Sequence, residues 1–438
     1  MPTVLYSADV VCPMTGPPLS AGGVLVEGDR IVAVGEATAL RPDADREHHI
    51  DGVLLPGLVN GHTNVELADA VHLARDGPHH AWLAAVGGLV RGWDDERWTR
   101  SAHRGVRIAL RAGVTALGDG VLHGPAVPAL SRAGVLGDSW VEVADADATH
   151  TDAVVAAVEH ALGLPAEGRR VGIAPAAPYR LGTGVLQALV ALAARTGAPL
   201  HIRAAQTQAE LAALRDGEGP LAEAARDKGL EMEWLDGGTD LTPVRYLDAC
   251  GALRPSTTLV HGVWVDAREA RLLAARGVAV VCTPRANARL SAGPTPLERY
   301  AAAGVRLALG TDSAAVVPDG DVLAEAAAWV ALAKEREMAF WPSSVGPIPL
   351  AEQAVRLATV DGAAALGWGD RAGVLEPGRR ADLVGVEIAT TAERVYHDLV
   401  EQGPGRQVLT VLGGVRKARR ASAAEPWPSI DHLEEWRT

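Results

Sequence analysis

The sequence predicts an α/β fold: a (β/α)8 TIM-type barrel with a small β-sandwich domain formed by the N- and C-terminal segments. Short apolar runs rich in Val, Leu and Ile recur eight times along the middle of the 438-residue chain. Segments with apolar residues at helical spacing separate these runs, and many of them end in Gly. Both ends of the chain instead alternate short β-like runs with Gly and Asp turns. Consecutive βα units of this kind build parallel sheets.

The eight apolar runs are the expected strands of the barrel. In chain order they cover residues 53–64, 113–120, 139–145, 170–178, 198–205, 257–265, 278–285 and 306–313. The segments between them, such as 184–197 and 266–277, are the expected helices. In a barrel of this type the active site lies at the carboxyl ends of the strands.

The flanking segments predict a second domain built from both termini. Residues 1–52 and 373–422 are the two expected parts of a β-sandwich, and residues 53–372 form the barrel between them. The last segment, 423–438, is expected to be a C-terminal tail.

Charge and composition exclude several classes of partner. The chain has 41 Lys plus Arg against 54 Asp plus Glu, a formal net charge of −13, so nucleic acid and anionic membranes are poor partners. The chain does not open on a secretory pattern, and apolar runs of about 18 residues do not occur. Three scattered cysteines do not suggest a disulfide framework. We therefore expect a cytoplasmic protein.

Polar side chains stand repeatedly at the ends of the expected strands. They are His62 and Asn64, Asp119, His201 and Arg203, His261, and Asp312. Residues i and i+2 of a strand share a face, so the members of each pair point the same way. A single Asp after a strand is more often a helix N-cap than a catalyst. The recurrence of such residues at the carboxyl ends nevertheless favours a binding or catalytic site there.

Six motifs carry a resemblance to a known family. They are LLPGLVNGHTNVEL, APLHIRAAQT, LVHGVWV, CTPRANARLSAG, LALGTDS and ATVDGAAALGWGDRAGVLEPGRRADLVGVE. Together they span nearly the whole chain and resemble the amidohydrolase superfamily. The resemblance is to the cytosine deaminase-like and triazine hydrolase-like branch, near the adenosylhomocysteine and aminodeoxyfutalosine deaminases. It implies the same barrel as the strand pattern, and it implies a homodimer.

The resemblance implies a single Zn²⁺ or Fe²⁺, but only part of the implied site is present. His62, His261 and Asp312 match a metal-binding histidine, a water-orienting histidine and a metal-binding aspartate. Asn64 and Arg203 stand where the resemblance implies metal-binding histidines. Gln206 stands where it implies a proton-carrying glutamate, and Ala176 replaces a histidine on the fourth strand. That strand contains no lysine, which excludes a carbamate-bridged binuclear site.

These departures predict a site that works without a metal, and hence no cofactor. Arginine has no lone pair to offer a cation. The Arg203 guanidinium is therefore expected to fill the volume of the metal and to satisfy the charge of Asp312. If a metal does bind, the expected ligands are His62, Asn64, His201 and Asp312, with Zn²⁺ or Fe²⁺ as the cation.

The function predicted first is acid–base chemistry on a small, cyclic, nitrogen-containing metabolite. His261 would act as acid or base with His62 or Asp312 orienting it, while Arg203 would bind a carboxylate or a developing anion. Gln206 would donate a hydrogen bond. The remaining expected substrate-binding residues are His62, Asn64, Glu66 as a spare carboxylate, His201, and Trp82 as a stacking surface.

Two alternatives remain open at this point. One is a metal-dependent C–N hydrolase or deaminase with an altered ligand set, and the other is a non-catalytic barrel that binds a metabolite or a partner. Loops at residues 72–83 and 314–325 are expected to cover the substrate, with His79 and His80 as exposed loop residues.

Overall fold

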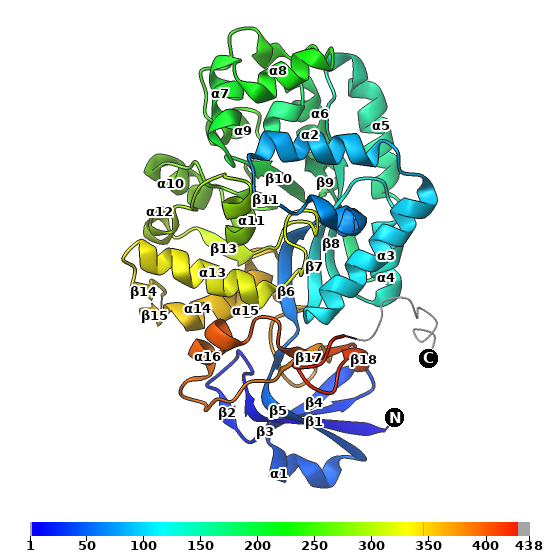
Figure 1. Cartoon of the computed structure of the whole chain (residues 1–438), viewed down its shortest axis with the longest axis vertical. Helices are drawn as coiled ribbons and strands as arrows, with labels where there is room; N and C mark the ends of the chain where they lie inside the picture. Colours follow the sequence, from blue (N-terminus) through cyan, green and yellow to red (C-terminus); the bar gives the residue numbers. More distant parts are fainter. Residues whose placement is uncertain (1, 345, 428–438) are drawn as a thin grey trace.

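Eight parallel strands form the central barrel of the computed structural model, which describes residues 2–344 and 346–427. The barrel strands are β6 (Leu58–Thr63), β7 (Val114–Val121), β8 (Leu136–Val143), β9 (Arg169–Pro175), β10 (Leu200–Ala204), β11 (Thr257–His261), β12 (Ala279–Cys282) and β13 (Arg306–Leu309). They are hydrogen-bonded in chain order, from β6 to β13. The predicted TIM-type barrel is therefore confirmed (Figure 1).

The first apolar run, residues 53–64, is divided between two sheets. Residues 46–56 form β5 (Arg46–Pro56), which pairs with strands from both ends of the chain, and β6 begins only at Leu58. A Cβ on Gly57, between the two strands, would lie 2.0 Å from Thr115 Oγ1, so the close approach at this junction requires glycine. The expected boundary between residues 52 and 53 thus falls inside β5.

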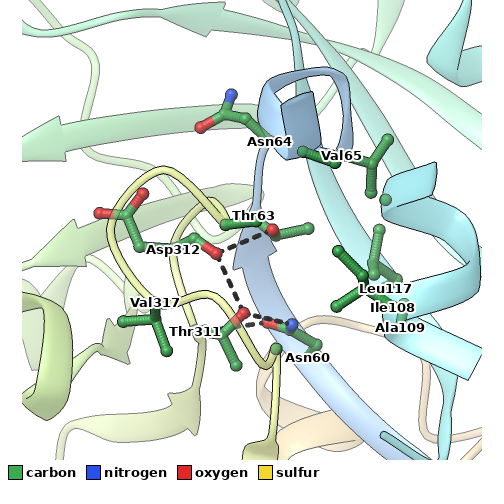
Figure 2. Close-up of a pocket in the computed structure, with 14 residues that line it drawn as sticks. Asn60, Thr63, Asn64, Val65, Ile108, Ala109, Leu117, Thr311, Asp312 and Val317 are labelled. Carbon is green, nitrogen blue, oxygen red and sulfur yellow. Dashed lines mark hydrogen bonds between the residues drawn. The ribbon is translucent and has the colours of Figure 1, made fainter. Parts of the chain in front are cut away.

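The barrel closes where the end of β13 meets β6. The backbone N–H groups of Thr311 and Asp312 both donate to the His62 carbonyl oxygen, at 3.1 and 3.0 Å. Two side-chain bonds join the same segments: Asn60 Nδ2 donates to Thr311 Oγ1 at 2.8 Å, and Thr63 Oγ1 donates to the Asp312 carbonyl at 2.8 Å (Figure 2). This hydrogen-bonded seam fixes the backbone on which His62 and Asp312 stand.

Helices surround the barrel and cover its ends (Figure 1). The helices of the barrel region are α2 (His79–Val90), α3 (Asp95–Arg111), α4 (Ala126–Ala133), α5 (Thr151–Leu162), α6 (Thr183–Thr196), α7 (Gln208–Asp216), α8 (Pro220–Asp227), α9 (Pro243–Ala249), α10 (Ala267–Ala275), α11 (Pro284–Arg289), α12 (Leu297–Ala303), α13 (Val322–Glu335), α14 (Leu350–Leu357) and α15 (Val360–Ala365). A short β-hairpin, β14 (Phe340–Trp341) and β15 (Ile348–Pro349), follows α13. Helix α3 shows how the sequence sets these elements. The Asp94 side chain caps its N-terminus, and its buried residues recur at helical spacing.

The two chain ends build a second, mostly antiparallel sheet of eight strands. Its strands are β1 (Thr3–Val11), β2 (Leu19–Ser20), β3 (Gly22–Glu27), β4 (Arg30–Glu36), β5, β16 (Leu383–Val386), β17 (Gln407–Leu412) and β18 (Val415–Arg419). β1 pairs with β5 in parallel, whereas β16 joins the C-terminal strands to β5 antiparallel. An isolated antiparallel bridge joins Arg30, at the start of the edge strand β4, to Arg380, just before β16. The sheet therefore curves and encloses a small hydrophobic core of its own. The predicted domain formed by both termini is confirmed.

The remaining elements connect the two parts. Helix α1 (Ala37–Leu40) lies in the terminal domain, and α16 (Val395–Gln402) packs on α13 and α14 of the barrel. Of the expected C-terminal tail, residues 428–438 lie outside the described residues. Within the described chain, no helix combines the length and apolar character needed to cross a membrane.

Candidate metal centre and active site

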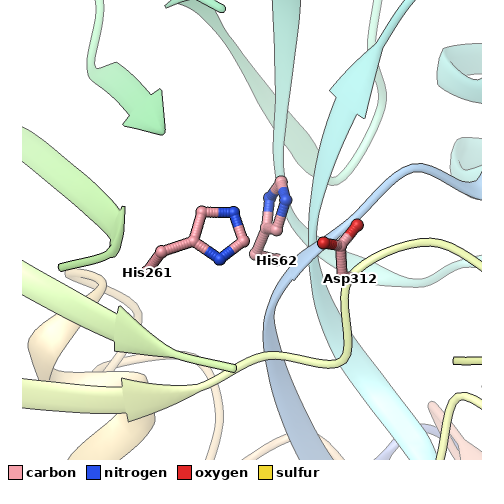
Figure 3. A group of neighbouring side chains, drawn as sticks. All are labelled: His62, His261 and Asp312. Atoms are coloured by element: carbon pink, nitrogen blue, oxygen red, sulfur yellow. The ribbon is translucent and has the colours of Figure 1, made fainter. Parts of the chain in front are cut away.

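Three side chains from different strand ends converge at the mouth of the barrel. His62 stands in β6, His261 ends β11, and Asp312 follows β13. A ligand atom from each residue lies within 4.8 Å of the other two, and all three residues are buried (Figure 3). His261 and Asp312 have left-handed backbone, with φ of +72° and +61°. Such conformations are uncommon for residues with a Cβ and concentrate at functional sites.

Hydrogen bonds orient the His261 ring with its Nε2 toward the group. Its Nδ1 lies 3.0 Å from Asn287 Oδ1 and 2.9 Å from Thr283 Oγ1. Because the Asn287 oxygen can only accept, Nδ1 must carry the proton, and Nε2 then carries a lone pair. Nε2 is buried without a hydrogen-bond partner among the described residues.

His62 is oriented in a similar way, by His201. Its Nδ1 lies 2.9 Å from His201 Nε2, whereas its Nε2 is buried and lacks a partner in the described part of the chain. His201 in turn stacks on Trp140, with ring centroids 3.9 Å apart and an interplanar angle of 7°. His201 therefore supports His62 and does not face the group with its Nε2.

The site keeps its histidines neutral. Burial lowers the pKa of His62 and His261 well below the ordinary value, and neighbouring cationic groups lower both further. Burial, followed by the charge of Arg203, lowers the pKa of His201 to about 3. For Asp312, burial raises the pKa, with the Ser313 backbone N–H and Arg203 opposing the shift. Neutral imidazole is the protonation state that binds metals.

The residues present fit a divalent cation. His62 Nε2 and His261 Nε2 are buried without partners among the described residues, and the Asp312 carboxylate lies beside the two rings. Two imidazoles and a carboxylate suit zinc, which keeps three protein ligands and one open position in catalytic sites. This converging group includes His261, which was not among the predicted ligands, whereas Asn64 and His201 make hydrogen bonds to Glu142 and His62.

Arg203 does not pair with Asp312, contrary to the prediction. Its Nη1 and Nη2 donate to the two carboxylate oxygens of Glu142 in β8, both at 2.6 Å. A two-pronged pair of this kind is the strongest geometry for a guanidinium and a carboxylate. The sequence did not indicate Glu142 as the partner, because residue spacing along one strand does not show which side chains of different strands meet in the barrel.

Glu142 is the functional-site residue that the sequence prediction missed. Its side chain is only 3% exposed and lines the same pocket as Arg203. Burial alone would raise its pKa, but the charge and hydrogen bonds of Arg203 and the bond from Asn64 outweigh burial, so the pKa is lowered and the group is ionised. The only sequence signal was a charged residue inside the apolar run 139–145.

Asn64 belongs to the Glu142 network. Its Nδ2 donates to Glu142 Oε1 at 2.8 Å and to the Gly120 carbonyl at 2.7 Å. Its side chain points away from the seam of Asn60, Thr311 and Asp312 (Figure 2). These bonds use the amide nitrogen of Asn64, and the converging group consists of His62, His261 and Asp312.

Two of the expected polar residues have structural roles. The Glu66 carboxylate accepts four backbone N–H groups, from Leu122, His123, Gly124 and Ala126, at 2.8 to 3.0 Å. These bonds hold the loop between β7 and α4, so Glu66 is not a spare proton carrier. Asp119 accepts from the Val65 backbone N–H at 2.9 Å and anchors the segment after β6.

A pocket over the converging side chains contains most of the other predicted site residues. Trp82, Arg203, Gln206, His261 and Asp312 all line it. Gln206 is buried, and its Nε2 has no partner among the described residues. Trp82 donates from Nε1 to the Ala315 carbonyl at 3.0 Å, which fixes its ring beside the pocket.

His79 was wrongly predicted to be an exposed loop residue. It begins helix α2, is only 7% exposed and lines the pocket. Burial, with the charges of Arg203 and Arg180, lowers its pKa to about 3. The prediction of a loop over residues 72–83 was wrong from His79 onward, because α2 begins there and brings His79 into the pocket lining. Tyr179 and Arg180, after β9, complete this wall.

Comparison with known proteins identifies the family. The amidohydrolase family description matches residues 53–415. The chain belongs to the amidohydrolase family. Over 325 residues it is 35% identical to the aminodeoxyfutalosine deaminase of Deinococcus radiodurans, covering 71% of this chain and 76% of that protein. It is 29% identical to the 5-methylthioadenosine/S-adenosylhomocysteine deaminase of Moorella thermoacetica, covering 94% of this chain and 93% of that one.

A solved structure shares the fold. The zinc-bound adenosine deaminase from Xanthomonas campestris superposes with a TM-score of 0.76 at 24% identity, covering 96% of this chain and 93% of that chain. The resemblance inferred from the motifs is confirmed at the level of the family. The predicted absence of a cofactor is not supported, because the buried group of His62, His261 and Asp312 fits a cation.

Proposed function

We propose that this protein is a metal-dependent C–N hydrolase that removes an exocyclic amino group from an adenosine-like nucleoside. The observation that carries the proposal is the convergence of His62, His261 and Asp312, with both Nε2 atoms buried and unpartnered within the described chain. The similarity to the deaminases from Deinococcus and Moorella supports the substrate class.

His62, His261 and one oxygen of Asp312 would hold the cation. When bound, such a cation lowers the pKa of a water molecule and so provides a nucleophile at neutral pH. The Nδ1 bond to Asn287 leaves His261 Nε2 available to the cation, and the contact with His201 orients the His62 ring. The second oxygen of Asp312 would carry the proton, because the other carboxylate among the described residues that line the pocket, Glu142, is engaged by Arg203. Gln206 can hydrogen-bond to the substrate but cannot carry a proton.

The pocket suits a planar ring with polar substituents. Trp82, Leu83 and Tyr179 supply aromatic and apolar surface, while Arg180 and Gln206 supply hydrogen-bond donors. A few polar groups in a mostly apolar wall orient a bound heterocycle. This arrangement agrees with the small cyclic nitrogen compound predicted from the sequence.

Metal content and turnover test the proposal together. Protein purified without chelators or affinity-tag metal, and again after Zn²⁺ or Fe²⁺ is supplied, should contain about one equivalent of metal per chain. It should convert adenosine-like nucleosides to inosine-like products, followed by ultraviolet absorbance. Asp312→Asn and His62→Asn should lose both properties, whereas His49→Asn, at an exposed site in the terminal domain, should keep them.

Each alternative has its own outcome. Less than about one-tenth of an equivalent of metal in both preparations, with turnover retained, would overturn the metal-dependent proposal in favour of acid–base chemistry by His261 and Arg203. Nucleoside binding with neither metal nor turnover would indicate a non-catalytic barrel.

A further inference from the structure

We propose that Glu142 is a positioning residue for the cation site. By binding Arg203 it holds the guanidinium away from Asp312 and leaves that carboxylate free to bind a cation. This inference rests on the proposed metal-dependent function. Neither Glu142 nor Arg203 would contact the cation, and their ion pair inside the pocket would act by keeping Asp312 available.

The Arg203–Glu142 pair is built into the barrel. Arg203 stands on β10 and Glu142 on β8, with β9 between them in the sheet. After β9 the chain continues with the buried Ala176 and Ala177, and Ala177 lines the same pocket as Arg203 and Glu142. Both N···O distances are 2.6 Å, and the side chains are 20% and 3% exposed.

The surroundings of Glu142 are fitted to the ionised carboxylate. Asn64 donates a third hydrogen bond to it, at 2.8 Å. At Gly120 a Cβ would lie 2.3 Å from Glu142 Oε1 and 2.5 Å from Asn64 Nδ2, so a side chain there would displace the network. Residues of β7 and β8, together with Asn64 directly after β6, therefore contribute to holding this one cationic side chain of β10.

Asp312 is the competing partner for Arg203. Among the described residues that line the pocket, Glu142 and Asp312 are the two carboxylates. A buried guanidinium needs an anionic partner, because an unpaired charge in a desolvated site is strongly unfavourable. If Glu142 lost its charge, Arg203 would turn toward Asp312, occupy the ligand oxygen and repel an incoming divalent cation.

Glu142 also compensates the charge of Arg203 in place. With the pair intact, the guanidinium adds little net positive charge beside His62 and His261. A cation can then bind a few ångströms away against weaker repulsion than a lone Arg203 would exert. The ion pair thus allows an arginine and a divalent metal to be present in the same pocket.

The test is a double-mutant cycle measured by metal affinity. Zn²⁺ binding would be followed by calorimetry, and Co²⁺ binding by its visible absorption, for wild type, Glu142→Gln and the double variant Glu142→Gln/Arg203→Gln. We expect Glu142→Gln to weaken binding by about 10- to 100-fold. The double variant should recover at least the wild-type affinity, because the competing cation has gone.

Asp138→Asn is the matched control. Asp138 lies on the same strand, is buried, and forms a fork with Arg170 at 2.8 Å for both bonds, but it stands near the start of β8, away from the mouth. Its loss should lower stability without changing metal affinity. If Glu142→Gln does not fold, Glu142→Asp, which shortens the reach to Arg203 but keeps the charge, should weaken binding by a smaller factor.

The outcomes separate this inference from the function beneath it. Unchanged affinity in Glu142→Gln, or no recovery in the double variant, would overturn the role of Glu142 while leaving the metal site intact. Absence of metal binding in the wild type would instead overturn the proposed function.

Discussion

His201 acts on the candidate metal site through His62. The bond between His62 Nδ1 and His201 Nε2 is 2.9 Å, and stacking on Trp140 holds the His201 ring in place. Replacing His201 with Phe keeps a stacking ring but removes the bond. We expect metal affinity to fall by about 10- to 100-fold, because His62 loses the contact that orients its ring. Calorimetric Zn²⁺ titration measures this change.

Trp140→Phe separates the hydrogen bond from the stacking. It alters the surface under His201 but leaves the bond to His62, so metal affinity should stay near the wild-type value while the melting temperature falls. Equal losses of affinity in both variants would show that general packing, and not the bond to His62, controls the site.

At the scale of single residues, the sequence located the histidines and Asp312 but not their partners. His62, His261 and Asp312 stand at strand ends, and strand ends of a barrel meet by geometry. Arg203 and Glu142, which form the two-pronged ion pair, are 61 positions apart in the chain. No periodicity relates two such positions. The pairing follows from the order of the strands in the folded barrel.

At the scale of elements, the strands were predictable but some boundaries and helices were not. Residues 53–64 read as one apolar run, yet β5 and β6 divide it because residues 53–56 pair with β1 and β16. Residues 72–83 were predicted to form a loop, but helix α2 begins at His79 within this segment. Its contact with the pocket is a tertiary property, and so the burial of His79 was not predicted.

Helix α2 provides a prediction about stability. Gly87 is exposed in the middle of the helix, and a Cβ there would have open space around it. Gly87→Ala should raise the free energy of unfolding by about 0.5–1 kcal/mol, because alanine loses less backbone entropy in a helix. Thermal unfolding followed by circular dichroism measures the gain.

Gly197→Ala gives the opposite case. Gly197 also has open space around it, but it ends α6 with a left-handed φ of +73°. Alanine is strained in that conformation, so this variant should be destabilised by about 1 kcal/mol. If both variants shift stability in the same direction, backbone conformation does not explain the effect of Gly87→Ala.

At the scale of the whole molecule, the joining of both chain ends into one domain was predictable from the similar β-rich patterns of the flanks. The contacts that fasten this domain to the barrel were not. Asp321 is one of them. It caps α13 through the Leu323 backbone N–H at 2.9 Å, and it accepts from Gln407 Nε2 at 2.8 Å and the Gly405 N–H at 2.6 Å. The homodimer and the cytoplasmic location remain predictions.

Asp321 should make the stability of the molecule depend on pH. Burial, the largest influence, raises its pKa to about 6, above the value of about 3.9 expected in the unfolded chain. Between these two pH values the folded state binds the proton more tightly than the unfolded chain does. The stabilisation that protonated Asp321 gives the folded state is therefore complete below about pH 4 and is lost as the pH rises through about 6. Asp321→Asn removes this titration. The difference in free energy of unfolding between wild type and variant, from urea denaturation, should therefore shrink by up to about 3 kcal/mol from about pH 4 to pH 7. Parallel pH profiles for the two proteins would show that Asp321 titrates alike in the folded and unfolded chains, and would rule out the contact between α13 and the terminal domain as the source of the pH dependence.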